Sequence, residues 1–493
     1  MSVLEYRDIH IERETSGNSP SLSQQLAQAL RRKIMNGQLS AGRRLSSSRA
    51  LASDLSLSRN TVNSAFEQLK AEGYLDSLPG SGFFVSRRLP TGDTPPESAI
   101  SHSVEEWPQL SRYGQTLQKA ADKYAARDKA NLPFTVGLPD LRAFPFRLWQ
   151  QLYRRHSDRL VLGGYHSPQG YWPLQQALAE YLNASRGLRC RPEQIVITQG
   201  AQQALALCAQ LLIEPGEAAL IEEPGYRGAQ RAFLSAGARL ETVVMGKHGV
   251  AVDQLPETGQ HRLLYCTPTH QYPLGGILPA HERLQLLQWA EQQKCWIVED
   301  DYDSEFHYYG QPVAALAGMA EKTPVIYMGS FSKTVLPGLR LGYLVVPEHL
   351  VDAFVAAKAA GSGESPILSQ AVLADFIGEG HFARHLRRSR RLYQQKWEHM
   401  RELCQQHLQG LMTPVVQSAG MHLAVSFDDQ SLDDRVISQR FYQKGYGSSP
   451  LSSYYYGSEV RSGLTLGFAH TAEQEREEGI QTLAELLRSQ PES

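Results

Sequence analysis

The sequence predicts a multidomain protein: a small N-terminal α+β domain, then a larger α/β domain, then a smaller C-terminal α+β domain. Three observations carry this prediction. Residues 22–85 hold three helical patterns followed by two strand-like segments. Residues 131–347 alternate apolar, strand-like runs with helical patterns, which is typical of a mostly parallel sheet covered on both faces. Charge also divides the chain, because residues 22–88 carry +6 and the remainder of the 493 residues carries −8.

The first 88 residues are predicted to form a winged helix-turn-helix. Leu26, Leu30 and Ile34 recur at helical spacing in the first helix. A second, short helix follows, and Ser58 is a good N-cap for a third. The Pro-Gly-Ser-Gly stretch at 79–82 joins two short strands into a hairpin. Three helices followed by a hairpin make up this DNA-binding motif.

Candidate DNA contacts lie at the start of the third predicted helix. Arg59, Asn60 and Thr61 follow the N-cap Ser58, and side chains at such a helix start can reach base edges in the major groove. The alternative is that Arg59 and Asn60 are ordinary polar helix residues, but hairpin, spacing and basic charge agree on a nucleic-acid interface. This domain resembles the GntR-type regulators in G-x-L-x-x-G-x-x-L-x-S-x-R-x-L-A, L-S-R-N-T-V and G-x-G-x-F-V. The resemblance implies further DNA contacts at Ser47, Arg49 and Gly82.

A lysine among small hydroxyl residues is the main candidate for chemistry. Lys333 follows the apolar run Val325–Met328, and Arg340 comes seven residues later. The hydroxyls of Ser330 and Ser332 and the guanidinium of Arg340 can bind phosphate oxygens. A desolvated lysine beside such a cation loses its proton more easily and becomes a nucleophile. The combination indicates a Schiff-base lysine that holds pyridoxal 5'-phosphate (PLP), whereas the alternative is a surface lysine after a strand.

Acidic residues at the end of a second strand would complete such a site. Trp296–Val298 is predicted to be a strand, and open α/β sheets bind their ligands at the carboxyl ends of strands. Asp300 is the candidate that holds the proton on the pyridine nitrogen, and Tyr302 is the candidate for the phenolic oxygen. A solvated acidic turn and a metal site are the alternatives. A metal site would need histidines in register, and only His307 is near, so no metal is expected.

Residues 130–490 resemble the fold-type I aminotransferases. The matching segments, in the family's order, are G-Y-H-S-P-Q-G, I-T-Q-G-A-Q-Q-A-L, E-E-P-G-Y, P-L-G-G, E-D-D-Y and S-F-S-K…P-G-L-R-L-G-Y. The resemblance implies a PLP-binding fold and a homodimer. Ala201 and Gln202 open a helix whose amides can bind phosphate. Tyr226 would stack on the pyridine, with core packing as its alternative role, and Tyr165 would reach a neighbouring subunit's phosphate.

The order of the predicted parts matches one known arrangement. Residues 89–130 have little apolar content and several prolines, as in an extended linker, and residues 348–493 complete the body. A GntR-type head, a linker and an aminotransferase-like body resemble the MocR subfamily, as do H-Q-Y-P and E-D-D-Y-D-S-E-F. The resemblance implies a transcriptional regulator that dimerises through its body and binds a double-stranded DNA operator. It would sense an amine, an amino acid or PLP through an aldimine at Lys333.

Two other functions stay open. The chain could be a metabolic aminotransferase with a vestigial head, or a DNA-binding protein whose body only dimerises, although the second leaves Lys333 without a role. In the aminotransferase family, an arginine that anchors the substrate carboxylate usually stands where this sequence has Thr465, within L-T-L-G-F. Arg461 is close but out of register. This departure weakens the prediction of an α-amino acid substrate and leaves the effector open.

The cysteines and the apolar runs indicate a compartment. The five cysteines form no C-x-x-C pair, and several lie in apolar runs, which suits free thiols in a reducing cytosol. The N-terminus is too charged for a signal peptide, and no apolar run is long enough to span a bilayer. A cytoplasmic protein without membrane contact is therefore expected.

A second basic segment lies far from the head. Its spacing predicts a helical face that is solvated or faces a partner subunit, rather than a second DNA site. The residues are Arg384, His385, Arg387, Arg388, Arg390 and Arg391.

Overall fold

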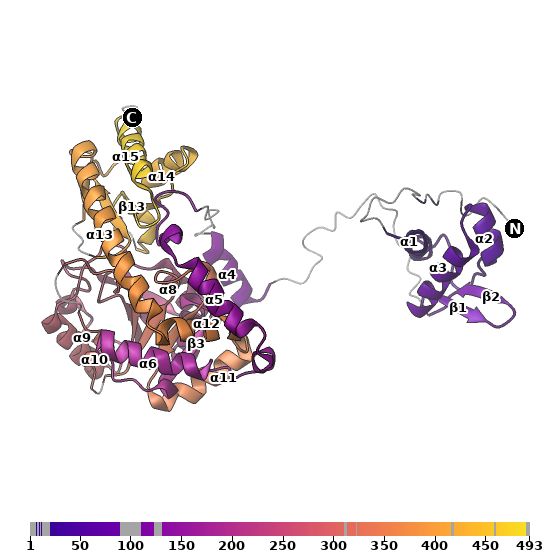
Figure 1. Cartoon of the computed structure of the whole chain (residues 1–493), viewed down its shortest axis with the longest axis horizontal. Helices are drawn as coiled ribbons and strands as arrows, with labels where there is room; N and C mark the ends of the chain where they lie inside the picture. Colours follow the sequence, from indigo (N-terminus) through magenta and orange to yellow (C-terminus); the bar gives the residue numbers. More distant parts are fainter. Residues whose placement is uncertain are drawn as a thin grey trace. The chain divides into compact units, whose positions relative to one another are not determined.

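The computed structural model describes residues 6, 9, 11, 20–88, 110–122, 131–309, 313–321, 323–415, 419–457 and 460–489. It contains two compact units, Met1–Gln109 and Leu110–Ser493, and each is described by itself (Figure 1). The division into 1–88, 89–130, 131–347 and 348–493 stays a prediction. Of the predicted linker, residues 89–109 and 123–130 lie outside the described residues.

The N-terminal unit has the predicted three helices and hairpin. Ser21 caps the first helix by a capping box with Gln24, and Ser58 accepts from the Thr61 amide, 3.1 Å away, to start the third. A buried apolar core that includes Leu30 and Phe66 holds the helices together. The elements are α1 (Leu22–Met35), α2 (Ser48–Asp54), α3 (Arg59–Ala71), β1 (Leu75–Leu78) and β2 (Gly82–Val85).

The second unit is built on a seven-stranded sheet with the order β3-β9-β8-β7-β6-β4-β5. The pairs β8–β7, β7–β6, β6–β4 and β4–β5 are parallel, and only β9 runs antiparallel to its neighbours, so the predicted mostly parallel sheet is confirmed. The strands are β3 (Ile195–Thr198), β4 (Ala218–Glu223), β5 (Arg239–Val244), β6 (His261–Cys266), β7 (Trp296–Asp301), β8 (Val325–Ser330) and β9 (Gly342–Val345).

Both faces of this sheet are buried, because successive residues of a strand join different apolar cores. Ile195 and Ile197 of β3 pack into one core, while Val196 packs into another. Helices contribute to these two cores and to a third one. They are α5 (Phe146–Ser157), α6 (Trp172–Arg186), α7 (Ala201–Leu212), α8 (Arg227–Ser235), α9 (Ala280–Gln293), α10 (Leu316–Met319), α11 (Val351–Gly361) and α12 (Ile367–Gly378).

A smaller antiparallel sheet with the order β10-β11-β13-β12 lies in the C-terminal part of the same unit. Two of its helices, α13 and α15, pack against each other. Its strands are β10 (Met412–Pro414), β11 (His422–Phe427), β12 (Ser449–Pro450) and β13 (Gly463–Gly467); its helices are α13 (His381–His407), α14 (Asp434–Gln443) and α15 (Glu473–Arg488).

One further helix, α4 (Arg112–Asp122), precedes the sheet and packs against α8. No helix among the described residues is long and apolar enough to cross a membrane.

Candidate cofactor-binding and DNA-binding sites

Lys333 lies in the turn after β8, where its amine is held by a backbone carbonyl. Nζ donates to the carbonyl oxygen of Gly137, 2.8 Å away. Gly137 has a φ of +76°, and a Cβ at this position would come within 2.3 Å of Nζ. The close approach therefore requires glycine. Gly137 was not among the residues predicted from the sequence.

Asp300 is buried near the carboxyl end of β7, and one of its oxygens is left unpaired. Oδ2 accepts from the hydroxyl of Tyr265, 2.7 Å away. Oδ1 is buried without a hydrogen-bond partner among the described residues. Burial raises the pKa of Asp300 to about 7, with further raising by Asp301 and Asp303, while Lys333 acts to lower it. A buried, unpaired carboxylate oxygen can accept from a cationic N–H group of a heterocycle.

Tyr302, the candidate for the phenolic oxygen, lies in a small polar cluster. Its hydroxyl is 2.8 Å from Nδ1 of His270. Oδ1 of Asp303 lies 2.9 Å from the same nitrogen. His270 and Asp303 are both buried. Neither was predicted to support Tyr302, although His270 belongs to the H-Q-Y-P segment quoted above.

The predicted phosphate-binding groups come together at the N-terminus of α7. Gly200 caps this helix, which begins with Ala201 and Gln202. Nη2 of Arg340 lies 3.5 Å from the carbonyl oxygen of Gln199, and a Cβ on Gly200 would lie 3.5 Å from the same Nη2. A guanidinium beside the amides of a helix N-terminus favours an anion.

The two serines of this predicted site stand at the end of β8. The hydroxyl of Ser330 accepts from the amide of Ser332, 3.2 Å away. Ser330 also pairs with Gly342 of β9, and a Cβ on Gly342 would lie 3.0 Å from the Cα of Gly200. This places the serine pair close to the start of α7.

The two predicted aromatic contacts differ in their surroundings. Tyr226 is the N-cap residue of α8, and its hydroxyl accepts from Nε2 of Gln202, 3.4 Å away. Its position beside the α7 start suits a ring over a bound heterocycle. Tyr165 is 98% exposed in the single chain, as a side chain that reaches a neighbouring subunit would be. Both roles stay predictions.

The predicted DNA-binding residues lie at the starts of α2, α3 and β2 in the N-terminal unit. Arg59 and Asn60 are exposed in the first turn of α3, and Thr61 is partly buried beside the cap Ser58. The remaining three also lie at element starts. Ser47 caps α2, Arg49 is exposed in the first turn of α2, and Gly82 opens β2 with a φ of +96°.

Comparison with known proteins decides the family. Residues 22–85 match the family "Bacterial regulatory proteins, gntR family", and residues 137–483 match "Aminotransferase class I and II". Over 464 residues the chain is 40% identical to the "Probable rhizopine catabolism regulatory protein MocR" of Rhizobium meliloti, covering 94% of this chain and 93% of that protein. The chain belongs to the MocR subfamily of GntR-type regulators.

Other similar proteins support the assignment of this chain to the MocR subfamily. It is 31% identical to the "HTH-type pyridoxine biosynthesis transcriptional regulator PdxR" of Corynebacterium glutamicum, over 91% of this chain and 92% of that one. The body also resembles the crystal structure of LysN, an alpha-aminoadipate aminotransferase from Thermus thermophilus complexed with N-(5'-phosphopyridoxyl)-L-leucine. The TM-score is 0.70 at 28% identity, covering 77% of this chain and 98% of LysN. The predicted winged helix-turn-helix head and fold-type I body of the MocR-type chain are thereby confirmed.

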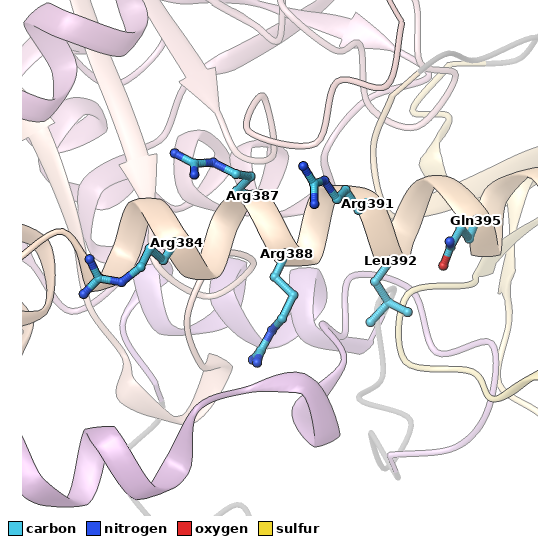
Figure 2. A pocket seen from close by; sticks show the side chains of 6 residues that line it. All are labelled: Arg384, Arg387, Arg388, Arg391, Leu392 and Gln395. Carbon is cyan, nitrogen blue, oxygen red and sulfur yellow. The ribbon is translucent and has the colours of Figure 1, made fainter.

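The basic segment of this MocR-type chain lies on α13, where it is split between two environments. His385 is buried, and Nε of Arg390 donates to the carbonyl oxygen of Glu305, 2.8 Å away. The other side chains line a hollow of about 400 Å³. In Figure 2, Arg387 and Arg391 point to one side of α13 and Arg388 to the other, so they do not converge on one point. The lining residues are Arg384, Arg387, Arg388, Arg391, Leu392 and Gln395.

Proposed function

We propose that this protein is a cytoplasmic, PLP-dependent transcriptional regulator. Its head binds a double-stranded DNA operator, and its body senses an amine, an amino acid or a PLP-type effector at Lys333. One observation carries the proposal. Oδ1 of Asp300 is buried without a hydrogen-bond partner among the described residues, and Asp300 stands on β7 next to β8, the strand that Lys333 follows.

The residues present fit PLP. When bound, PLP supplies an electron sink for chemistry at an amine. Asp300 would hold the proton on the ring nitrogen, and Tyr302 would hold the phenolic oxygen, with its orientation set by His270. Tyr226 would cover one face of the ring. The phosphate group would lie at the α7 N-terminus, between Ala201, Gln202, Arg340, Ser330 and Ser332, with Tyr165 added from a second subunit.

The body offers support for a homodimer. Leu160 is 94% exposed and Val161 is 65% exposed, just before the exposed Tyr165. Large apolar side chains that are exposed together in one short segment are typical of a surface that a partner covers. A second copy of the chain would cover this segment and receive Tyr165 at the same time.

The packing of α4 supports a route from the sensing site to the linker. This helix is the first described element after residues 89–109, and it packs against α8. Tyr226, the predicted ring contact, is the N-cap residue of α8. An effector that displaces Tyr226 would therefore act on α4 through one helix. Such a ligand shifts an equilibrium only by its difference in affinity for the two states.

A metabolic aminotransferase is the second candidate, because Lys333, Asp300 and Arg340 would serve both functions. The experiment follows one purified sample through two measurements, the visible absorption of the bound cofactor and the affinity for operator DNA. A sensor changes both when its effector is added, with little turnover. Rapid multiple turnover of an amino acid at constant DNA affinity would establish the enzyme instead.

A further inference from the structure

Thr465 occupies the position where the aminotransferase family usually has its carboxylate-binding arginine, and the structure shows what its hydroxyl does. It lies in β13, paired with Ala424 on one side and Ser449 on the other, and is fully buried. Its Oγ1 donates to the carbonyl oxygen of Ser449, 3.2 Å away. Since a carbonyl oxygen can only accept, this bond fixes the direction of the threonine proton.

Two tyrosines continue from Thr465 toward the cofactor site. The hydroxyl of Tyr454 lies 3.1 Å from Oγ1 of Thr465 and must donate to it, because the threonine proton is already used. The hydroxyl of Tyr272 donates to Tyr454 in turn, 3.2 Å away. The three hydroxyls therefore donate in one direction, from Tyr272 to Tyr454, from Tyr454 to Thr465 and from Thr465 to the carbonyl of Ser449.

Tyr272 lies between two predicted cofactor contacts. Its ring is 5.8 Å from that of Tyr226 and 5.4 Å from that of Tyr302, edge to face in both cases. Its hydroxyl already donates its one proton to Tyr454, so any further partner of this oxygen must be a donor. A group that donates a hydrogen bond fits there. A carboxylate does not, because it is also only an acceptor.

The charged groups near Tyr272 leave one cation, Arg227, that could bind a carboxylate. The ring of His422 is 5.4 Å from that of Tyr272, and burial lowers the pKa of His422 to about 4, so the imidazole is neutral. Lys333 and Arg340 are used by the cofactor in the proposed function. Arg227, on α8, stacks over the ring of Tyr454 at 5.2 Å from its centroid, and it is the cation that a test must examine.

We propose that the effector is a hydroxylated primary amine without an α-carboxylate, whose hydroxyl donates to the oxygen of Tyr272. This proposal rests on the proposed function, because the amine end reacts at the Lys333 site. A buried carboxylate would lose its water shell and face lone pairs, whereas a hydroxyl exchanges one hydrogen bond for another.

The test uses two series, each made of a plain amine, its hydroxylated form and the matching amino acid. The first is ethylamine, ethanolamine and serine, and the second is phenethylamine, tyramine and tyrosine. Each compound is titrated into the full-length holoprotein, and the half-saturating concentration is read from the visible absorption of the cofactor. In the series that responds at the lower concentration, the hydroxylated amine should bind about five-fold or more tightly than the other two members. Tighter binding of the amino acid, or no response in either series, overturns the proposal.

Two variants separate the hydroxyl contact from other causes. Tyr272→Phe should remove the advantage of the hydroxylated amine over the plain amine, while Tyr153→Phe, on exposed α5 surface, should leave it unchanged. Arg227→Gln should leave the weak binding of the amino acid as it is. A selective loss of amino-acid binding in Arg227→Gln would show that Arg227 holds a carboxylate and would overturn the proposal.

The same data keep the two proposals apart. If the holoprotein has no visible band that depends on Lys333, the proposed function itself fails. If the band is present and the amino acid binds more tightly than the hydroxylated amine, only the effector class fails.

Discussion

The hydroxyl of Tyr265 donates to Oδ2 of Asp300 across 2.7 Å, between the neighbouring strands β6 and β7. Both residues are buried. The bond fixes the plane of the carboxylate and leaves Oδ1 for a ligand. It also opposes the effect of burial, since it lowers the pKa of Asp300 that desolvation raises.

Tyr265→Phe is expected to weaken PLP binding by about ten-fold or more. The substitution removes one hydrogen bond to a charged group, worth about 1.5–3 kcal/mol, without creating a large cavity. The measurement is a cofactor titration of apoprotein by absorbance. Tyr327→Phe is the matched control, because the buried Tyr327 hydroxyl donates to Oδ2 of Asp301 instead, 2.6 Å away. Equal losses in both variants would show a general effect on the sheet.

Asp300→Asn is expected to change how the stability of the apoprotein depends on pH. Burial raises the pKa of Asp300 from 3.8 to about 7. Between these values the unfolded chain releases a proton that the folded chain keeps, so wild-type stability falls as pH rises through this range and levels off above it. The asparagine has no proton to release. As pH rises to about 7, the melting temperature of the wild type should therefore fall relative to that of Asp300→Asn. If the melting temperatures of the two proteins depend on pH in the same way, the pKa of Asp300 is not raised.

Lys333→Ala is expected to lose the visible absorption of bound PLP while the chain stays folded. The amine at Lys333 forms the covalent link, and alanine has none. Lys358→Met is the control, because Lys358 is also buried and its pKa is lowered by burial to about 8. Borohydride reduction followed by peptide mapping identifies the attachment point. A reducible chromophore that persists in Lys333→Ala would move the link to another lysine.

The sequence allowed the prediction of those site residues that stand in short, contiguous motifs. Lys333 and Arg340 were found because strand, serines and turn adjoin them in the chain. Gly137 and Tyr265 were missed, since their contacts are made by folding: Gly137 is 196 residues from Lys333, and Tyr265 is 35 residues from Asp300. Spacing along a chain carries no signal for such pairs.

For the fold as well, local sequence patterns allowed a prediction, and features set by distant parts of the chain did not. Continuous apolar runs such as Val325–Met328 identify buried strands, and β8 was predicted to within two residues of its end. The antiparallel direction of β9 could not be predicted, because its burial pattern is the same in either direction. The support of Tyr302 by His270 was missed for a similar reason, since a buried histidine in a loop has no periodic signature.

Arg59→Ala is expected to weaken binding to the specific operator by about 1–3 kcal/mol, if the arginine contacts a base edge. Arg59 is exposed in the first turn of α3, the end that can enter the major groove. Lys70→Ala is the control, because Lys70 lies in the last turn of the same helix. Fluorescence anisotropy with operator and unrelated duplexes separates the cases. An equal loss on both duplexes would make Arg59 a phosphate contact.

Gly137→Ala is expected to lower PLP loading more than it lowers stability. The added Cβ would lie 2.3 Å from Nζ of Lys333 and would push the amine from the carbonyl that now holds it. The φ of +76° at Gly137 adds strain of roughly 1 kcal/mol for any other residue. Gly361→Ala is the control, since a Cβ there would meet no atom of the described residues within 4 Å. Cofactor content per chain and the melting temperature of the apoprotein are measured together.

If the Lys333 amine is positioned by Gly137, PLP loading falls in Gly137→Ala and not in Gly361→Ala, while the melting temperature of Gly137→Ala is only a few degrees lower. Full loading in Gly137→Ala would mean that the lysine reaches the cofactor along another path, and that the 2.8 Å contact has no part in holding the amine.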